Sequence, residues 1–298
     1  MSEVLVIGDA IVDFVFDGIG RLPDPGEETV ASQYELRPGG SAGYASVGLS
    51  ALGVKTHVAT LVGRDPLSDR WLNFVGAQGV NTASVDRVPD ETISTAAAFL
   101  TKTDRSFVTY RGACGSDRVF VPEAGNRDAV LVTGFSQAPY LWSEELISFI
   151  QSLSNQDVSV LLDTNWSSSE WHDAFAAVAP AVDYLLVNDQ EARRLGDSET
   201  VAAAGQALID CGVGTCVVKT GADGCTLVDS TGSKTVETEP RDAIDVCGAG
   251  DFFNAGFVAA LLDERTALAA AANGNRCAGE AIQAFAIHEK LNRIRGLS

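Results

Sequence analysis

Short apolar runs alternate with amphipathic stretches along most of the chain. The apolar runs are mostly continuous, which is typical of strands that are covered on both faces. The stretches between them place apolar residues at helical spacing. Strands that alternate with helices in this way predict a mostly parallel sheet with helices on both faces. Strands are expected at 4–8, 56–62, 129–134, 158–163, 184–188, 215–221 and 225–229, and helices at 41–53, 68–79, 143–154, 170–182, 198–212 and over most of the last 50 residues.

Two of the expected helices begin with a serine that is followed by Glu in the first turn, namely Ser143 and Ser198. A hydroxyl in this position accepts hydrogen bonds from amides that have no partner inside the helix. Both serines are therefore expected to be N-caps.

Two segments, 14–37 and 94–112, do not follow this rhythm. Both combine turn residues with alternating polar and apolar positions, and the second reads as a hairpin that turns at 102–105. Neither supplies a crossover helix, so both are expected in a small separate sheet that could act as a lid. Such a sheet has an exposed edge and outer face, and the hypothesis is a homodimer through the lid. The expected units are this lid and a large α/β domain made of 1–13, 38–93 and 113–298.

The overall composition fits one large folded unit. A chain of 298 residues with 46% hydrophobic residues can bury a substantial core. It has no apolar run of about 18 residues or more, and its start lacks the features of a secretory signal. These observations predict a cytoplasmic protein without a membrane span. The six cysteines form no C-x-x-C pair and no zinc-ligand spacing with histidine, so buried free thiols are expected.

The charge of the chain is strongly negative. Forty acidic residues face 21 basic ones, which gives a net charge of -19, and only five residues are lysines. Nucleic acid and anionic membranes are therefore excluded as expected partners, because their phosphates would be repelled. In molar salt the Debye length falls to about 3 Å, which screens the self-repulsion of such a surface. The composition favours a halophilic protein in a salt-rich cytoplasm; the alternative is an ordinary acidic protein in ordinary salt.

The segment Asp245-Val-Cys-Gly-Ala-Gly-Asp251 carries the strongest chemical signal. A Gly-Ala-Gly turn opens an apolar helix, where free amides form a cradle for an anion. Asp251 lies at the same helix start, from which its carboxylate can reach a reacting hydroxyl. A kinase needs both parts, since donors stabilise the transferred phosphoryl group and a carboxylate accepts the hydroxyl proton. The alternative is a glycine-rich helix start with an aspartate cap.

Further motifs occur in order along the chain and extend this signal over nearly all of it. Together with D-x-x-GAGD-x-F near the C-terminus, these motifs give the chain a pattern that resembles the ribokinase-like (PfkB) carbohydrate kinase family. The resemblance implies a three-layer α/β/α domain with a mostly parallel sheet and a small β-sheet lid, and an ATP-dependent, Mg²⁺-dependent phosphotransferase. The motifs are Gly39-Gly40, VGRD at 62–65, AQGVNT at 77–82, Asp163-Thr-Asn165, Asn188-Asp-Gln-Glu191 and VVKTGADG at 217–224.

The resemblance also implies roles for residues around the phosphates. Asp251 would be the catalytic base, and the backbone of Gly248, Ala249 and Gly250 would form the anion hole. Asn188 and Glu191 would organise Mg²⁺ through water, although Asn188 could instead cap the helix that follows it. The nucleotide would contact a further set of residues: Lys219, Thr220, Gly221, Gly224 and Asn273. For Asn273 the alternative is a residue on the helix surface.

At the substrate end, Asp13 resembles the family's acceptor for a sugar hydroxyl, or else caps a turn. Gly39 and Gly40 would let the backbone approach the sugar, and Asp163, at a strand end, would be a further substrate-binding residue. Asp245 resembles the family residue near a monovalent-cation site, which suggests K⁺ as a further cofactor. Cys247 is expected to be a packing residue, because nothing nearby supplies a base.

Several positions depart from the family pattern and put ribose in doubt. Tyr44 stands where the family often has an Asn that contacts the sugar, Ile11 where ribokinases tend to have Asn, and Val246 where Thr is frequent. The pair Tyr110-Arg111 on the lid strand looks more like the 2-keto-3-deoxygluconate kinase and fructokinase branches. Arg111 could then hold a substrate carboxylate or phosphate, or it could be a plain surface arginine.

The resulting hypothesis is a kinase that phosphorylates a hydroxyl of a sugar or sugar acid. One alternative within the same fold is a nucleoside kinase, in which Tyr44 and Tyr110 would stack on a base. Another is a non-catalytic sugar-binding or regulatory protein, against which the intact Asp251 and Gly-Ala-Gly argue. The sequence does not specify the sugar, the hydroxyl or the phosphoryl donor.

Overall fold

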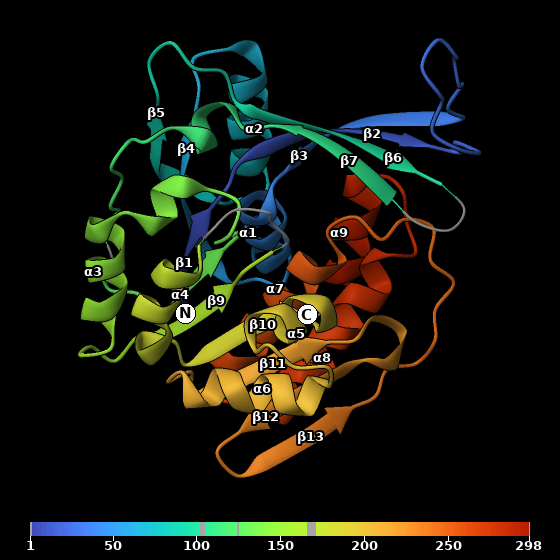
Figure 1. The fold of residues 1–298 in the computed structure, drawn as a ribbon. Helices are drawn as coiled ribbons and strands as arrows, with labels where there is room; N and C mark the ends of the chain where they lie inside the picture. Colours follow the sequence, from blue (N-terminus) through green and yellow to red (C-terminus); the bar gives the residue numbers. More distant parts are fainter. Residues whose placement is uncertain (1, 102–104, 124, 166–170, 298) are drawn as a thin grey trace.

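The chain folds into two sheets with helices packed around the larger one (Figure 1). The structure is a computed structural model, and it describes residues 2–101, 105–123, 125–165 and 171–297. Sheet A has helices on both faces, and sheet B extends from its side. This is the predicted three-layer α/β/α arrangement with a second, smaller sheet, so the predicted fold class is confirmed.

Sheet A contains nine strands in the order β13-β12-β11-β10-β9-β8-β1-β4-β5. All neighbours from β11 to β5 pair in parallel, whereas β12 and β13 are antiparallel. The strands are β1 (Glu3–Gly8), β4 (Lys55–Val62), β5 (Asn81–Arg87), β8 (Ala129–Thr133), β9 (Ser159–Asp163), β10 (Tyr184–Asn188), β11 (Thr215–Lys219), β12 (Cys225–Asp229) and β13 (Gly232–Val236).

Two helical layers cover sheet A because its strands are apolar on both faces. Val4 and Val6 of β1 point into one core and Leu5 and Ile7 into the other, all fully buried. On the first face lie α1 (Ser41–Ala51), α2 (Pro66–Ala77), α7 (Ala249–Leu262), α8 (Ala267–Ala281) and α9 (Ile287–Arg295). On the second lie α3 (Glu144–Leu153), α4 (His172–Val178), α5 (Asp189–Leu195) and α6 (Val201–Asp210). Short 3-10 turns are η1 (Gly112–Gly115), η2 (Pro139–Trp142), η3 (Ala179–Ala181) and η4 (Gly221–Asp223).

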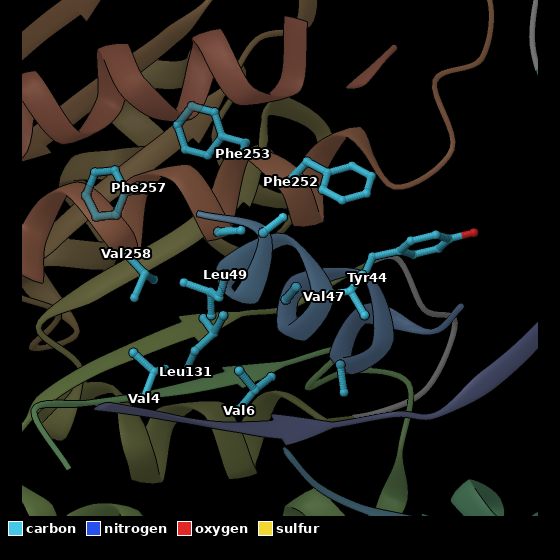
Figure 2. Packing of buried hydrophobic residues seen from close by; sticks show 14 of the residues in the cluster. Val4, Val6, Tyr44, Val47, Leu49, Leu131, Phe252, Phe253, Phe257 and Val258 are labelled. Atoms are coloured by element: carbon cyan, nitrogen blue, oxygen red, sulfur yellow. The ribbon is translucent and has the colours of Figure 1, made fainter. Parts of the chain in front are cut away.

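The first core fixes the position of α7. In Figure 2 the side chains of Val4, Val6 and Leu131 point from sheet A toward α1 and α7, where Leu49 and Val258 meet them. Burial of each large apolar side chain stabilises the fold by roughly 1.5–3 kcal/mol. The start of α7 is therefore held firmly against the end of sheet A.

Of the two predicted N-caps, one is confirmed and one is wrong. Ser143 caps α3, since its hydroxyl accepts a hydrogen bond from Leu146 N at 3.3 Å. The prediction for Ser198 is wrong, because α6 starts only at Val201 and Thr200 caps it. The hydroxyl of Ser198 instead donates to Gly196 O, in the turn that leaves α5.

Sheet B has the strand order β3-β2-β6-β7. Its strands are β2 (Ile11–Asp17), β3 (Gln33–Gly39), β6 (Ser94–Leu100) and β7 (Arg105–Tyr110). The pairing of β6 with β7 is antiparallel, as the predicted hairpin requires, while residues 102–104 of the turn predicted at 102–105 lie outside the described residues. Its first strand begins at Ile11 and its second ends at Gly39, so the sheet includes Asp13 and reaches the glycine pair. Within the described residues, no helix is long and apolar enough to cross a membrane.

Candidate active site

Polar side chains gather where the parallel strands of sheet A end. Asp163 ends β9, Asn188 ends β10 and Lys219 ends β11, while Asp9 follows β1 directly. The carboxyl ends of parallel strands lie along one edge of a sheet, which is where ligands bind in open α/β folds. The first turns of α7 reach the same edge, because Lys219 Nζ lies 3.2 Å from Asn254 Oδ1.

Lys219 and Asp163 form a buried ion pair at the centre of this edge. Lys219 Nζ donates to Asp163 Oδ1 at 2.9 Å, and Thr133 Oγ1 donates to Asp163 Oδ2 at 3.1 Å. Burial by itself would lower the pKa of Lys219, but the surrounding carboxylates of Asp163, Glu191 and Asp251 outweigh it and raise the pKa. Lys219 is therefore a fixed positive charge at the strand ends.

Asp251, the predicted base, lies in the first turn of α7 beside this pair. Burial raises its pKa well above the ordinary range, the negative charge of Asp163 raises it further, and Lys219 opposes the rise. A Cβ placed on the neighbouring Gly250 would lie 3.5 Å from Lys219 Nζ, so the ammonium sits directly against the helix start. A carboxylate with a raised pKa is a good proton acceptor.

The turn that opens α7 requires glycine. Gly248 has a left-handed φ of 78°, and a Cβ there would lie 3.2 Å from the ring of Tyr44. The amide of Ala249 donates to Val246 O at 3.2 Å. The amides of Gly250 and Asp251 follow in the first turn, where the helix itself offers no acceptor. The amides of Gly250 and Asp251 are therefore the candidates to bind an anion, while the amide of Ala249 holds the turn; the anion hole of Gly248, Ala249 and Gly250 stays a prediction.

Asn188 and Glu191 form a capping box at the start of α5. Asn188 Oδ1 accepts from Glu191 N at 2.8 Å, and Glu191 Oε2 accepts from Asn188 N at 3.0 Å. The capping role considered for Asn188 is thus present, and its role toward Mg²⁺ stays a prediction. Glu191 also accepts from Thr164 Oγ1, and burial and Asp163 raise its pKa. Within the described part of the chain, no group of three or more His, Cys, Asp or Glu could hold a metal ion.

The other residues predicted at the nucleotide lie in two places. Thr220, Gly221 and Gly224 form the turn between β11 and β12, in which Thr220 N donates to Gly224 O at 2.8 Å. Both glycines have positive φ, and a Cβ on Gly224 would meet Val236 O at 2.2 Å. Asn273 lies on α8 and donates to Gly256 O of α7 at 2.7 Å. Asn273 therefore joins the two helices, and its contact with adenine stays a prediction.

Asp13 lies at the inner end of sheet B, where Tyr44 of α1 meets it. Tyr44 OH donates to Asp13 Oδ2 at 2.8 Å, and Figure 2 shows this hydroxyl directed away from the other labelled side chains. A Cβ on Gly39 would lie 2.1 Å from the same Oδ2, and one on Gly40 would lie 2.3 Å from Asp9 O. Both glycines are thus required by close packing around the aspartates. Burial raises the pKa of Asp13 to about 7.

Sequence reasoning missed Asp9. Its Oδ1 accepts from Ser41 N at 3.1 Å, and burial raises its pKa to about 6. Asn165, quoted only as part of a motif, has a positive φ of 61° and donates to Ser41 Oγ at 2.6 Å. A usable signal existed for Asp9, since it follows an apolar strand as directly as Asp163 ends one.

Tyr110 and Arg111 are placed differently from each other. In sheet B, Asp13 pairs with Ala96 and Ala96 with Thr109, so Tyr110 lies on the face opposite to Asp13. The structure therefore does not bring Tyr110 to Asp13, and its side chain is 57% exposed. Arg111 Nη1 donates to the carbonyl of Gln137, in the loop after β8, which places it near the strand ends.

Asp245 is enclosed by two cationic side chains. Its Oδ2 lies 2.5 Å from Arg37 Nη1 and 3.0 Å from Lys290 Nζ, and its Oδ1 accepts from Cys247 N at 2.9 Å. Burial would raise its pKa, but Lys290 and Arg37 outweigh this and lower it. Both carboxylate oxygens are engaged, so these residues do not fit a K⁺ ion at this position.

The cysteines are free thiols among the described residues, and all are buried except Cys211. Burial raises the pKa of Cys247 to about 12, which leaves it a packing residue as predicted. It lies beneath sheet B with Val15, Ala98 and Leu100, and Phe285 packs against this group.

Three curated relatives align over most of the chain. The ribokinase of Bacillus subtilis is 27% identical over 96% of this chain and 94% of that protein. The 2-dehydro-3-deoxygluconokinase of Haemophilus influenzae is 24% identical over 82% of this chain and 84% of that protein. The nucleoside kinase of Methanothermobacter thermautotrophicus is 26% identical over 87% of this chain and 82% of that protein.

Solved structures have the same fold. The ribokinase of Arabidopsis thaliana complexed with ribose and ATP gives a TM-score of 0.82 at 22% identity, with 100% of both chains covered. A protein described as ribokinase II from E. coli, in complex with ATP and Mg²⁺, gives 0.81 at 21% identity, over 99% of this chain and 98% of that chain. The sequence pattern described as pfkB family carbohydrate kinase matches residues 1–291. This chain therefore belongs to the pfkB family of carbohydrate kinases, which are phosphotransferases.

Proposed function

We propose that this protein transfers the γ-phosphoryl group of ATP to a hydroxyl of a sugar or sugar acid, with Asp251 as the general base. The observation that carries the proposal is the meeting of three features at the strand ends: Asp251, the first turn of α7, and the ammonium of Lys219. A carboxylate that takes a proton, beside donors that hold negative charge, is what phosphoryl transfer requires.

In this proposal the hydroxyl oxygen attacks the γ-phosphorus in line while Asp251 takes its proton, the bond from this phosphorus to the β,γ-bridging oxygen breaks, and ADP leaves. The amides of Gly250 and Asp251 hold the charge on the transferred oxygens, and Lys219 attracts the phosphates. Mg²⁺ bound with the nucleotide would neutralise part of the phosphate charge. Because Mg²⁺ keeps several of its waters, Glu191 and Asn188 would hold it through that shell. Relatives in complex with ATP, and with ATP and Mg²⁺, support this choice of donor and metal.

At the acceptor end, Asp13 would receive a sugar hydroxyl, with Gly39 and Gly40 leaving room for it. Tyr44 OH, which donates to Asp13, would be the second polar group facing the sugar. Arg111 lies by the loop after β8 and would pair with a carboxylate of a sugar acid. The names of the relatives, which include a ribokinase and a 2-dehydro-3-deoxygluconokinase, support this substrate class.

The nucleoside alternative finds less support. Tyr44 is only 4% exposed and its ring lies edge-on to Phe252, so it offers no open face to a base. Tyr110 lies on the outer face of sheet B. One relative is named a nucleoside kinase, so nucleosides are included among the substrates to be tested. A non-catalytic binding protein would have no need of Asp251 and the glycine turn before it.

Sheet B is proposed to act as the lid, formed by 14–37 and 94–112, over a large domain formed by the rest. Asp13 directly precedes the first lid segment and accepts from Tyr44 OH of the large domain, so closure would cover a sugar bound at this carboxylate and exclude water from the reaction. The outer side of sheet B carries exposed apolar residues, which supports a homodimer through the lid. These are Tyr34, Val108 and Tyr110.

The test is ATP-dependent phosphorylation of a panel of sugars, sugar acids and nucleosides in molar KCl. We expect one class to turn over, and Asp251→Asn to lose at least about 10³-fold in kcat because the base is gone. Asp263→Asn, at the exposed far end of the same helix, is the matched control and should retain activity.

Two outcomes would contradict the proposal. If the wild type binds sugars but transfers phosphate to none, the binding-protein alternative replaces it. If Asp251→Asn binds ATP and sugar and turns over at the wild-type rate, the base lies elsewhere.

A further inference from the structure

A lysine with no exposed side-chain surface lies under the loop that leads into α7. Lys290, on α9, places Nζ 2.8 Å from Asp245 O, 3.0 Å from Asp245 Oδ2 and 3.2 Å from Cys247 O. An ammonium has three hydrogens, and three oxygens surround this one. The chain has only five lysines, and one of them is completely buried. Burial of an ammonium has a high desolvation cost unless the charge is paired.

The surrounding charges balance the buried ammonium. Arg37, also with no exposed side-chain surface, contacts the same Asp245 Oδ2 at 2.5 Å. Arg37 also contacts Glu35 Oε2 at 2.6 Å and donates to Phe285 O at 2.6 Å. Two cations therefore face two carboxylates. Burial and the charge of Arg37 lower the pKa of Lys290, and Asp245 opposes this shift, so the contact with Asp245 is what favours the ammonium inside the protein.

The oxygens around Lys290 are of the kind that hold a monovalent cation. They comprise one carboxylate and two backbone carbonyls, and K⁺ is bound by carbonyl oxygens in the same manner. The resemblance to the kinase family suggested K⁺ near Asp245, but the ammonium and the guanidinium already engage this carboxylate. The cation at this position is thus part of the chain.

The same contacts determine the shape of the anion hole. Lys290 holds the carbonyls of Asp245 and Cys247, on either side of Val246. The carbonyl of Val246 in turn accepts from the amide of Ala249, which closes the turn at Gly248. The amides that face the phosphoryl group follow immediately in the chain.

We propose that the ammonium of Lys290 replaces a monovalent cation and acts as a positioning residue for the anion hole, so that catalysis does not depend on K⁺. The proposal rests on the proposed kinase function. A tethered cation cannot dissociate, and its position is fixed by α9. The reaction rate should then be indifferent to which monovalent cation is in solution.

The first experiment compares the wild type in KCl, NaCl and choline chloride at one ionic strength. We expect kcat and the melting temperature to agree among the three salts, kcat within about twofold. A wild type that turns over only in KCl would overturn the proposal. The melting temperature is measured without ATP or sugar, so this comparison stands even if no substrate is found.

The second experiment removes the ammonium of Lys290 and leaves space in which an ion from solution can bind. Lys290→Ala should lower kcat about 10²-fold in choline chloride while KM for the sugar changes little, because a shift of the turn misplaces the donors. Addition of K⁺ or NH₄⁺ should restore most of the rate and raise the melting temperature of this variant at constant ionic strength. Lys290→Met fills the same space without a charge, so neither ion should rescue it. Lys234→Ala, an exposed lysine on β13, is the control and should behave as wild type.

These experiments distinguish a role of Lys290 as a replacement for a bound cation from a role in packing alone. If Lys290→Ala folds but responds equally to every salt, in both rate and melting temperature, Lys290 is a structural residue and the proposal fails. If Lys290→Ala does not fold in any salt, the wild-type comparison decides. If no substrate is found, the proposed function fails, and the salt dependence of the melting temperatures still tests the assignment of Lys290.

Discussion

Asp13 and Asp9 are carboxylates that the fold encloses close to one another. Burial is the main cause of their raised pKa values, about 7 for Asp13 and about 6 for Asp9. Asp13 also receives the hydroxyl of Tyr44, which favours its charged form but does not offset burial. The carboxyl groups of Asp13 and Asp9 therefore change their protonation state near neutral pH.

Asp13→Asn should make the free energy of unfolding less dependent on pH. The folded state holds the Asp13 proton up to about pH 7, and the unfolded state releases it near pH 3.9. Stability is therefore full below the lower value and falls as pH rises through the higher one. Asp13→Asn lacks this loss. Its free energy of unfolding should therefore exceed that of the wild type by up to about 4 kcal/mol at pH 9 and differ little from it at pH 4.

Urea unfolding at a series of pH values measures this effect. Asp17→Asn, at the last residue of the same strand, is the control and should follow the wild type. Equal pH slopes for Asp13→Asn and wild type would show that Asp13 is not protonated at neutral pH.

The sequence predicted those site residues that follow strong local patterns. Asp163, Lys219 and Asp251 end strands or begin a helix, and topology alone brings such positions together. Asp9 directly follows an apolar strand and could have been found in the same way, whereas its partner Ser41 is distant in the chain and only the fold brings the two together. The face that Tyr110 occupies depends on the register of β7 against β6, which sequence alone leaves open.

At the scale of elements, continuous apolar runs identified the interior strands of sheet A well. The sequence analysis missed β5 and β13, which are the edge strands. An edge strand is exposed on part of its surface, so it needs fewer apolar residues and leaves a weaker pattern. All residues of β7, an edge of sheet B, are exposed in the same way.

The edge and outer face of sheet B lead to a prediction about assembly. Val108 is 68% exposed on β7, and burial of this surface against a second copy would be favourable. Light scattering should give about twice the chain mass of 31.2 kDa. Val108→Asp should shift the protein toward the monomer, whereas Val119→Asp, with an equally apolar exposed side chain outside sheet B, should not.

A wild-type monomer across a range of salt and protein concentrations would be inconsistent with this dimer. A dimer that Val108→Asp leaves intact would place the contact elsewhere on the surface.

At the scale of the whole molecule, negative charge dominates the surface. Among the described residues the fold buries two of the basic side chains, Arg37 and Lys290, and five acidic ones, so the surface is slightly less acidic than the composition indicates but stays strongly negative; the buried acids are Asp9, Asp13, Asp163, Glu191 and Asp245. The ion pairs between exposed residues contribute little to stability. The sequence predicted the net charge but not which cations the fold would bury.

Screening of this charge should stabilise the protein. Between 0.1 M and 2 M KCl we expect the melting temperature to rise by about 5–10 °C, because the Debye length falls and self-repulsion weakens. NaCl should act equally, since screening depends on ionic strength. Scanning calorimetry that shows no rise, or a fall, would mean that the acidic surface is not an adaptation to salt.

The thiol of Cys247 lies beneath sheet B and beside the turn that opens α7. Its burial and its raised pKa protect it from alkylating reagents while Val15, Ala98 and Leu100 cover it. We expect a reagent to reach this sulfur when sheet B lifts from the turn. The rate of its modification therefore reports how often the proposed lid opens, and a ligand that holds the lid closed will slow the labelling.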